Sequence, residues 1–437
     1  MTGQNLSGFD AALKDVYGPR IIEQLNLVCS LSDWIDEDDS ADWTGRQVIY
    51  PIHVARNQGV GASAEGARLP QAGAQAYADC KIPEKYNYGR IQLTGQVIKA
   101  STENKGAFTR AMESELKGLV KDMGNDRERQ FFGAGGGVLC LLYGAQTLTG
   151  TATGSINVDS PYGITPTTNG CRFLQPGMVC TVLHPSANTV QGTFTVTATA
   201  AFAADGSNFA YSSGSGACSD NARVVRGNAD VPAGTTNNYT NEVMGLLGLI
   251  DDSTYCATLH NIARATYPIF NSPVIANIGG LTVDVIQRLI DASDELGGGD
   301  FASEGVFFCH YSVRREYLKL LQPDRRYTGA DLNTPDAGVK NAALKKGGEI
   351  TYGDRPWKVA KHCPYGTLFG FLKGSITRYI HVRGEWADED ERILRNVVGY
   401  DAWEAFYRIF DNLAMDRPNE GFRGDGINAT VVVNHNY

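Results

Sequence analysis

The sequence feature that most constrains the fold is a predicted helix of unusual length over residues 104–132. Apolar residues recur within it at spacings of three and four, which places them on one helix face: Phe108, Met112, Leu116, Leu119 and Met123. Ser101 and Thr102 are candidate N-caps, and the glycine-rich stretch 133–137 ends the pattern. At 1.5 Å per residue, such a helix would be roughly 40 Å long. It therefore needs a second long element to lie along.

Two strands are predicted before this helix, and a long connection separates them. The first strand shows alternation of apolar with polar or special residues, as in a half-buried strand: Val48, Tyr50, Ile52 and Val54. Residues 86–98 are predicted to form the second strand of the pair. The connection has no apolar period and too few hydrophobic residues for a core of its own. We therefore expect the contacts that order this hairpin to come from another copy of the chain.

The order of these segments resembles that of a known family. The connection carries Glu65-Gly66 and Leu69-Pro70, and the polar-faced long helix ends over residues 126–133. In this order they resemble the tailed-phage major capsid proteins, whose fold is shared by encapsulin shells and herpesvirus capsids. The resemblance implies that the hairpin is the family's extended loop, which lies across a neighbouring subunit, and that the helix is its spine helix.

Composition places the chain among large globular proteins. Its 437 residues suffice for two or three domains, and 42% hydrophobic with 20% charged residues is ordinary for a soluble protein. The net charge of -9 argues against a general nucleic-acid binder, which normally shows a basic stripe. The N-terminus has no basic segment followed by an apolar one, and no apolar run approaches twenty residues. We therefore predict neither a signal peptide nor a membrane span.

Neither the cysteines nor the histidines form a chemical motif. The nine cysteines include no Cys-x-x-Cys and no Cys/His cluster with zinc spacing, so reduced, mostly buried thiols are expected. A Cys171–Cys180 or Cys171–Cys218 bridge stays open as an alternative. The seven histidines show no paired spacing, and the motifs of serine hydrolases, zinc proteases and phosphate-binding loops are absent from the sequence. We predict that the chain is not an enzyme and uses no cofactor or metal.

The first 45 residues are predicted to form an N-terminal arm. Two short helices are split by Gly18-Pro19, and an acidic stretch over 33–42 follows, with Trp34 and Trp43 as its large anchors. A solvated loop explains the acidic stretch. The resemblance favours instead an extended arm whose two tryptophans contact another subunit. The clustered carboxylates lack the Asp/Asn-Gly alternation of a calcium loop.

Residues 144–236 differ in composition from the rest of the chain. They contain no lysine or glutamate, and threonine, serine, glycine, alanine and asparagine dominate. Phe194, Val196 and Ala198 alternate with threonines, which predicts a strand, and Pro176-Gly177 predicts a turn. We expect a small all-β insertion, which the resemblance also implies at about this place; the alternative is a flexible linker.

The segment 237–374 is predicted to be mixed α/β, in an order that matches the family's axial domain. Its predicted elements are a helix containing Leu281, Val285, Leu289, Ala292 and Leu296, a strand over 306–309, a helix burying Val313 and Tyr317, and strands over 349–352, 357–360 and 367–372. Residues 375–437 are predicted to return as strands of the peripheral domain, with 403–410 central and 430–433 last.

A local group of cations accompanies the second of these helices. It consists of Arg314, Arg315, Lys319, Arg325 and Arg326. A solvated helix face explains most of this group. The functional alternative is ion pairing with a neighbouring subunit around the axis of a capsomer.

The predicted fold class is α+β, the phage major-capsid fold with a small all-β insertion. Its predicted parts are the N-terminal arm (1–45), the extended β-hairpin loop (46–100), the spine helix and start of the peripheral domain (101–143), the inserted β domain (144–236), the axial domain (237–374) and the returning strands of the peripheral domain (375–437). The candidate subunit contacts are Trp34, Trp43, Glu65, Arg68, Arg314, Arg315, Arg325 and Arg326.

The resemblance implies a major capsid protein of the virion, assembled in the host cytoplasm. Its partner would be the chain itself, in hexamers and pentamers of an icosahedral shell that encloses phage double-stranded DNA without sequence-specific binding. Scaffold, portal and decoration proteins would be further partners, and no membrane is involved. Two alternatives stay open: an encapsulin-like compartment that holds enzymes, and a protein of another class that recognises a glycan or receptor through its β insertion.

Overall fold

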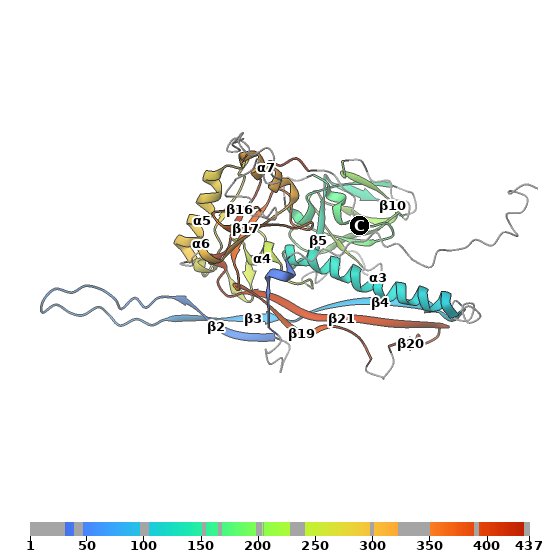
Figure 1. The fold of residues 1–437 in the computed structure, drawn as a ribbon, viewed down its shortest axis with the longest axis horizontal. Helices are drawn as coiled ribbons and strands as arrows, with labels where there is room; N and C mark the ends of the chain where they lie inside the picture. The colour runs from blue at the N-terminus through green and yellow to red at the C-terminus, as the bar shows by residue number, and fades with distance from the viewer. Residues whose placement is uncertain are drawn as a thin grey trace, which may run out of the picture.

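The computed structural model describes residues 31–38, 47–96, 105–150, 154–164, 168–197, 203, 205–227, 241–297, 301–321, 350–388 and 393–431. A long helix lies along an antiparallel sheet, and a β-barrel and an α/β unit lie on the helix side of that sheet (Figure 1). A two-stranded hairpin projects from the body in the direction away from the barrel (Figure 1).

The predicted long helix is confirmed as α3 (Lys105–Phe132). It runs beside β4 (Lys85–Thr94) and β21 (Ala402–Met415), which pair antiparallel over their common length and supply the second long element that the helix requires (Figure 1). Leu119 faces Gly89 of β4, where a Cβ atom would lie 3.0 Å from the leucine side chain. The missing side chain lets the helix approach the strand closely. Of the predicted apolar face, Met123 is buried and Leu116 is half-buried, whereas Phe108 and Met112 have side chains outside the described residues.

The sheet beneath α3 has β21 at its centre, as predicted for this segment. Its order is β1 (Asp36–Asp38), β19 (Ile376–Trp386), β21 and β20 (Arg395–Asn396), and β4 also pairs with β21. β1 runs parallel to β19, with Asp36 opposite Thr377. The sheet thus joins strands from the start, the first quarter and the end of the sequence.

The hairpin is confirmed, but its predicted second strand is wrong. β2 (Gln47–Ala55) pairs with β3 (Ala76–Pro83), and not with the segment 86–98. That later segment forms β4, which belongs to the other sheet. β3 was missed because its outer half is polar or small, and only Cys80 and Ile82 are fully buried. Ala76, Ala78, Cys80 and Ile82 do occupy alternate positions, but two of the four are alanines, which give a weak strand signal.

The all-β insertion is a closed barrel. Its strands are β5 (Val138–Leu142), β7 (Gly154–Asp159), β8 (Val179–Leu183), β9 (Val190–Val196), β10 (Asn208–Cys218) and β11 (Arg223–Arg226), with β6 (Gln146–Leu148) attached to the end of β10. They follow the order β10-β7-β5-β11-β8-β9, and β9 pairs with β10 to close the ring. β9 alternates between buried and half-buried residues, which confirms the period-2 prediction.

The barrel begins at β5, ahead of the start predicted at residue 144. The apolar run of β5 follows directly after the glycines that end α3, so composition did not separate it from the helix region. The cysteines of the described residues are free and buried, so neither alternative bridge of Cys171 forms. Burial raises the pKa of the Cys171 and Cys180 thiols to about 12, which keeps both protonated at neutral pH.

The α/β unit is built on a six-stranded sheet of order β14-β22-β18-β15-β17-β16. The strands are β14 (Val274–Ile275), β15 (Gly305–Cys309), β16 (Thr351–Tyr352), β17 (Arg355–Val359), β18 (Leu368–Leu372) and β22 (Phe422–Gly424). The helices are α4 (Leu246–Leu249), α5 (Val283–Gly297), α6 (Phe301–Glu304) and α7 (Tyr311–Leu321). The short elements elsewhere are β12 (Thr258–Leu259), β13 (Ile262–Ala263), η1 (Ser32–Trp34), η2 (Pro161–Gly163), η3 (Gly170–Phe173), η4 (Pro268–Phe270) and η5 (Pro418–Glu420).

Two predictions for the C-terminal half need correction. Thr430 and Val431 are not in a strand, and the last strand is β22, which joins the six-stranded sheet and not the sheet of β21. Residues 432 and 433 lie outside the described ranges. The helix α5 is confirmed, but its fully buried residues include Ile286 and Ile290, whereas Leu296 is exposed.

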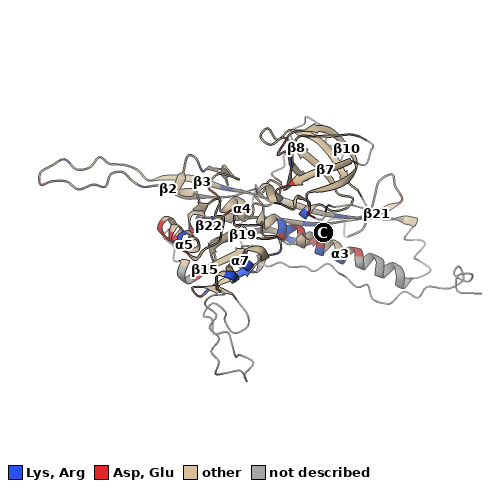
Figure 2. Cartoon of the chain, turned by 90° about the horizontal axis from the view of Figure 1, so that it is seen from above, with Lys and Arg blue, Asp and Glu red and all other residues tan. Residues whose placement is uncertain are grey.

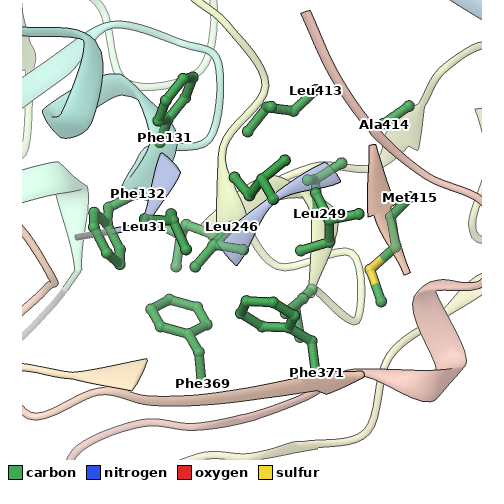
Figure 3. Close-up of a cluster of buried hydrophobic side chains, with 14 of the residues drawn as sticks. Leu31, Phe131, Phe132, Leu246, Leu249, Phe369, Phe371, Leu413, Ala414 and Met415 are labelled. Atoms are coloured by element: carbon green, nitrogen blue, oxygen red, sulfur yellow. The ribbon is translucent and has the colours of Figure 1, made fainter. Parts of the chain in front are cut away.

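One hydrophobic core joins the long helix to the α/β unit (Figure 3). Phe131 and Phe132 at the end of α3 lie beside Leu246 and Leu249 of α4, and Phe369 of β18 completes this cluster (Figure 3). Further members come from β21 and from the residue before η1: Leu413, Ala414, Met415 and Leu31. Burying these side chains fixes the end of the helix against both sheets.

A buried group of charges lies beside this core. Arg127 of α3 and Arg378 of β19 both donate hydrogen bonds to the carboxylate of Asp411 in β21. The Nε atom of Arg378 lies 2.7 Å from Oδ2 of Asp411. Arg378 also donates from Nη1 to Oε1 of Glu37 in β1 at 2.8 Å. Asp411 is fully buried, so its charge depends on these two guanidinium groups. The group connects α3, β21, β19 and β1.

We predict that Asp411→Asn lowers the free energy of unfolding by roughly 3 kcal/mol or more, because it leaves the buried Arg127 without its counter-charge. Urea denaturation monitored by circular dichroism measures the change. The matched control is Glu385→Gln, which removes the partner of Arg408 from the same sheet at an exposed position. Glu385→Gln should lower the free energy of unfolding by less than about 1 kcal/mol. Equal losses in the two variants would contradict the assigned role of Asp411.

Candidate assembly surfaces

The root of the hairpin is fixed to the body of its own chain. Cys80 and Ile82 of β3 are fully buried in the core that contains the end of α3. The main-chain N–H of Lys81 donates to the carbonyl of His260 at 2.9 Å, and the hydroxyl of Tyr50 donates to Oδ1 of Asp416 at 2.5 Å. These contacts set the direction in which the rest of the hairpin leaves the body.

The outer part of the hairpin, residues 56–75, carries no core of its own. The outgoing and returning segments of the hairpin lie close together near Gly59 and Gly73. A Cβ atom on Gly73 would lie 2.5 Å from Oδ1 of Asn57. The same oxygen accepts a hydrogen bond from the N–H of Gly59 at 2.7 Å. Within the described structure, this part rests on such local contacts, and almost all its residues are exposed. We call residues 56–75 the arm tip.

Glu65 and Arg68, two of the predicted contact residues, lie at the far end of the arm tip. The N–H of Ala67 donates to the carbonyl of Ala64 at 3.0 Å, and Gly66 has a φ of 74°, so these residues form a tight turn. Ser63 Oγ donates to the carbonyl of Arg68 at 3.3 Å just beyond it. Both charged side chains are exposed. The structure therefore places both residues at the turn that ends the arm tip.

Four large apolar side chains of the hairpin are exposed and were not among the predicted contacts; Ile49 of β2, at 52%, is the least exposed of them. Val60 is 87% exposed, Leu69 is 79% exposed and Tyr77 is 65% exposed. Isolated apolar residues in a stretch rich in glycine, alanine and glutamine give no periodic signal, so periodicity alone does not mark them as contacts. Their spacing along one projecting element makes them candidate contacts for another molecule.

The described part of the N-terminal arm lies on its own chain. Trp34 is half-buried against the core, and Lys358 Nζ lies 4.9 Å from the centre of its ring. Glu37 forms ion pairs with Arg378 and Arg383 of β19. Trp43, the other predicted anchor, lies outside the described residues. The structure thus gives Trp34 an internal packing role, and its contact with a neighbour stays a prediction.

The predicted cation group is divided between described and undescribed residues. Arg314 and Arg315 lie at the start of α7, where the Arg314 guanidinium is 5.1 Å from the ring of Tyr311 and Arg315 donates to the carbonyl of Thr430. Arg325 and Arg326 lie outside the described residues. Figure 2 shows the cations gathered on α7.

Two other kinds of feature, a metal site and a membrane-spanning helix, are absent from the described residues. Within the described ranges, no three or more His, Cys, Asp or Glu side chains are grouped so that they could hold a metal ion. None of the described helices combines the length and the apolar character needed to cross a membrane.

Comparison with known proteins identifies the fold. No protein-family model and no curated protein matches the chain. Among solved structures, it is similar to the capsid of cyanophage A-1(L), with a TM-score of 0.55 and 9% identity over 95% of this chain and 98% of that chain. It also resembles the capsid of a native GTA particle (TM-score 0.47, 8% identity, 95% of each chain) and the holo-SrpI encapsulin of Synechococcus elongatus (TM-score 0.46, 7% identity, 100% of each chain).

The match to the cyanophage capsid extends over 95% of this chain and 98% of that chain, so it concerns the architecture of the whole chain and not one domain alone. An identity of 9% shows the fold and no more. The chain has the phage capsid fold.

Proposed function

We propose that this chain is a major capsid protein that assembles into an icosahedral shell around phage double-stranded DNA. The observation that carries the proposal is the full-length similarity to the cyanophage A-1(L) capsid. The projecting hairpin supports it, because this element has exposed apolar side chains that its own chain leaves uncovered in the described structure. The proposed role is structural and not catalytic.

In this proposal the arm tip lies across a neighbouring subunit. Burying Val60 and Leu69 there would stabilise the contact by about 25 cal/mol for each Å² of apolar surface removed from water. Glu65 and Arg68 would form charged contacts beside them, and Arg314 and Arg315 would face a neighbour around the capsomer axis. Trp43, Arg325 and Arg326 are proposed contacts from outside the described ranges, and Trp34 would contribute the part of its ring that its own chain leaves exposed. Many such modest contacts, repeated around a shell, hold subunits that no single contact would hold.

The charge of the chain agrees with a container for DNA. A net charge of -9 disfavours tight binding to a polyphosphate, so the shell would enclose packaged DNA without binding it tightly. Hexamers and pentamers of the chain would form the shell, and scaffold, portal and decoration proteins are the further partners expected of such a particle in the virion.

The content of purified particles tests the DNA part of the proposal. We expect sedimentation velocity and negative-stain microscopy of the expressed chain to show capsomers, tubes or closed shells. Particles from infected cells should protect double-stranded DNA from added nuclease. Particles that instead contain a co-purifying enzyme and no protected DNA would identify a compartment shell. A chain that stays monomeric at all concentrations and salts, with or without a scaffold, would contradict shell formation.

We predict that removing most of the arm tip prevents assembly and leaves the subunit folded. In this variant, residues 57–74 are replaced by Asn-Gly, which joins β2 to β3 through a tight hairpin turn. The buried root residues Cys80 and Ile82 stay in place, so the urea midpoint should change little. Sedimentation velocity should then show no shells. The smaller deletion of 61–76 provides a second test, and normal shells from both variants would show that the arm tip is not the connector.

We also predict that the double variant Val60→Asp/Leu69→Asp fails to assemble, because each change places a charge in a surface proposed to be buried between subunits. Both positions are exposed in the subunit, so its unfolding free energy should change by less than about 0.5 kcal/mol per substitution. The control is Tyr143→Asp on the barrel, which alters a side chain that is 67% exposed. Electron microscopy should show shells from the control alone; shells from both proteins would count against the arm contact.

A further inference from the structure

A cavity of about 330 Å³ lies where the barrel meets the α/β unit. Arg172 of η3 lines it from the barrel, Arg314 and Arg315 line it from the start of α7, and Lys361 lines it from the loop between β17 and β18. The described residues around the cavity thus include four cationic side chains and no acidic side chain. Such a concentration of one charge in a partly enclosed space is costly unless an anion is present.

Arg172 is the most buried of these cations. It is 7% exposed, and its guanidinium donates to the main-chain carbonyls of Cys363, at 3.1 Å, and of Lys361. The rings of Tyr365 and Phe173 lie 4.1 and 4.9 Å from the guanidinium carbon. Arginine stays charged in proteins, and neutral carbonyls orient this charge without cancelling it.

The two arginines of α7 add charge from the opposite wall. The Nε atom of Arg314 is buried and has no hydrogen-bond partner among the described residues. Arg315 is exposed and donates to the main-chain carbonyl of Thr430. Neither forms an ion pair with an acidic residue in the described part of the chain. An anion in the cavity could therefore accept hydrogen bonds that the chain itself leaves unused.

The titrating groups around the cavity respond to the same positive field. Burial and, second to it, the charge of Arg172 together lower the pKa of both His310 and His362 to about 3. Asp126 offsets a small part of this effect at His362. Burial and Arg172 also lower the pKa of Lys361. The N–H of Ser312 donates to Nδ1 of His310 at 3.2 Å, so in the neutral ring the hydrogen lies on Nε2, where it can be donated.

We propose that this cavity binds a phosphate-class dianion, either inorganic phosphate or the phosphate of a mononucleotide. Two negative charges match a four-cation site better than the single charge of a carboxylate does. The planar guanidinium group of arginine can also donate two parallel hydrogen bonds to phosphate oxygens. The volume lies near the lower end of the range for small-molecule pockets, which fits a small ligand and not a nucleic-acid duplex. The aromatic rings of Phe173, Tyr311 and Tyr365 could hold a base. This inference does not depend on shell formation.

Isothermal titration calorimetry on the full chain tests the proposal, with inorganic phosphate and adenosine monophosphate as separate ligands in chloride buffers of matched ionic strength. We expect saturable binding of one ligand per chain. Arg314→Gln should weaken binding at least tenfold, because it removes one of the charged donors. The control is Lys319→Gln, which removes a cation from the same helix at a position that is exposed, paired with Glu316 and outside the cavity; its affinity should equal that of the wild type.

Lys361→Gln provides a second variant, because Arg314 is partly buried and its replacement could disturb folding. Similar affinities for the two ligands would support free phosphate as the natural ligand, and an affinity at least tenfold higher for the mononucleotide would support a nucleotide. Absence of saturable binding up to ~10 mM of either ligand would overturn the proposal. Wild-type affinity in both charge-removing variants, or an equal loss in Lys319→Gln, would also overturn it. Lys361 is not among the proposed subunit contacts, so microscopy of Lys361→Gln measures shell formation separately from anion binding, and the two proposals can fail independently.

Discussion

The buried carboxylate of Asp411 is the interaction on which the arrangement of the other elements most depends. A buried charge is stable only with partners that point at it, and its two partners come from different elements: Arg127 from α3 and Arg378 from β19. Arg378 reaches further to Glu37, which holds β1 at the sheet edge. The next residue, Asn412, donates to the carbonyl of Pro83 at the end of the hairpin. One stretch of β21 therefore positions the long helix, the N-terminal strand and the hairpin root.

This arrangement separates a rigid body from a projecting arm. The root of the hairpin shares the core of Phe131 and Phe132, and the arm tip shares no core at all in the described structure. Exposed Val60 and Leu69 lie on the part that the body does not hold. In the proposed shell, contacts with a neighbouring subunit would complete the packing that the single chain lacks, as a hairpin of this length requires.

At the junction of the barrel with the α/β unit, a buried arginine is held by neutral carbonyl groups and not by a carboxylate. Arg172 crosses this junction, donating to two carbonyls of the loop that precedes β18 and lying against the ring of Tyr365. Because the cations around it lack acidic partners in the described residues, the junction carries a local positive charge within an acidic protein. A bound dianion would neutralise part of that charge and would contact both units at once.

The sequence by itself determined the elements whose burial repeats at short range: α3, the alternating strand β9, the apolar strand β15 and the helix α7. It also placed Glu65 and Arg68 on a long connection, because glycine and a missing apolar period are local features. The tertiary structure alone decided which elements pair. Periodicity shows that one face of a segment is buried but not against what. For this reason β3 was overlooked as the partner of β2, and the whole of 375–437 was assigned to one domain although β22 within it joins the other sheet. Charged residues are expected at the surface, so Arg127 and Asp411, separated by 284 residues, gave no sign of meeting in the interior.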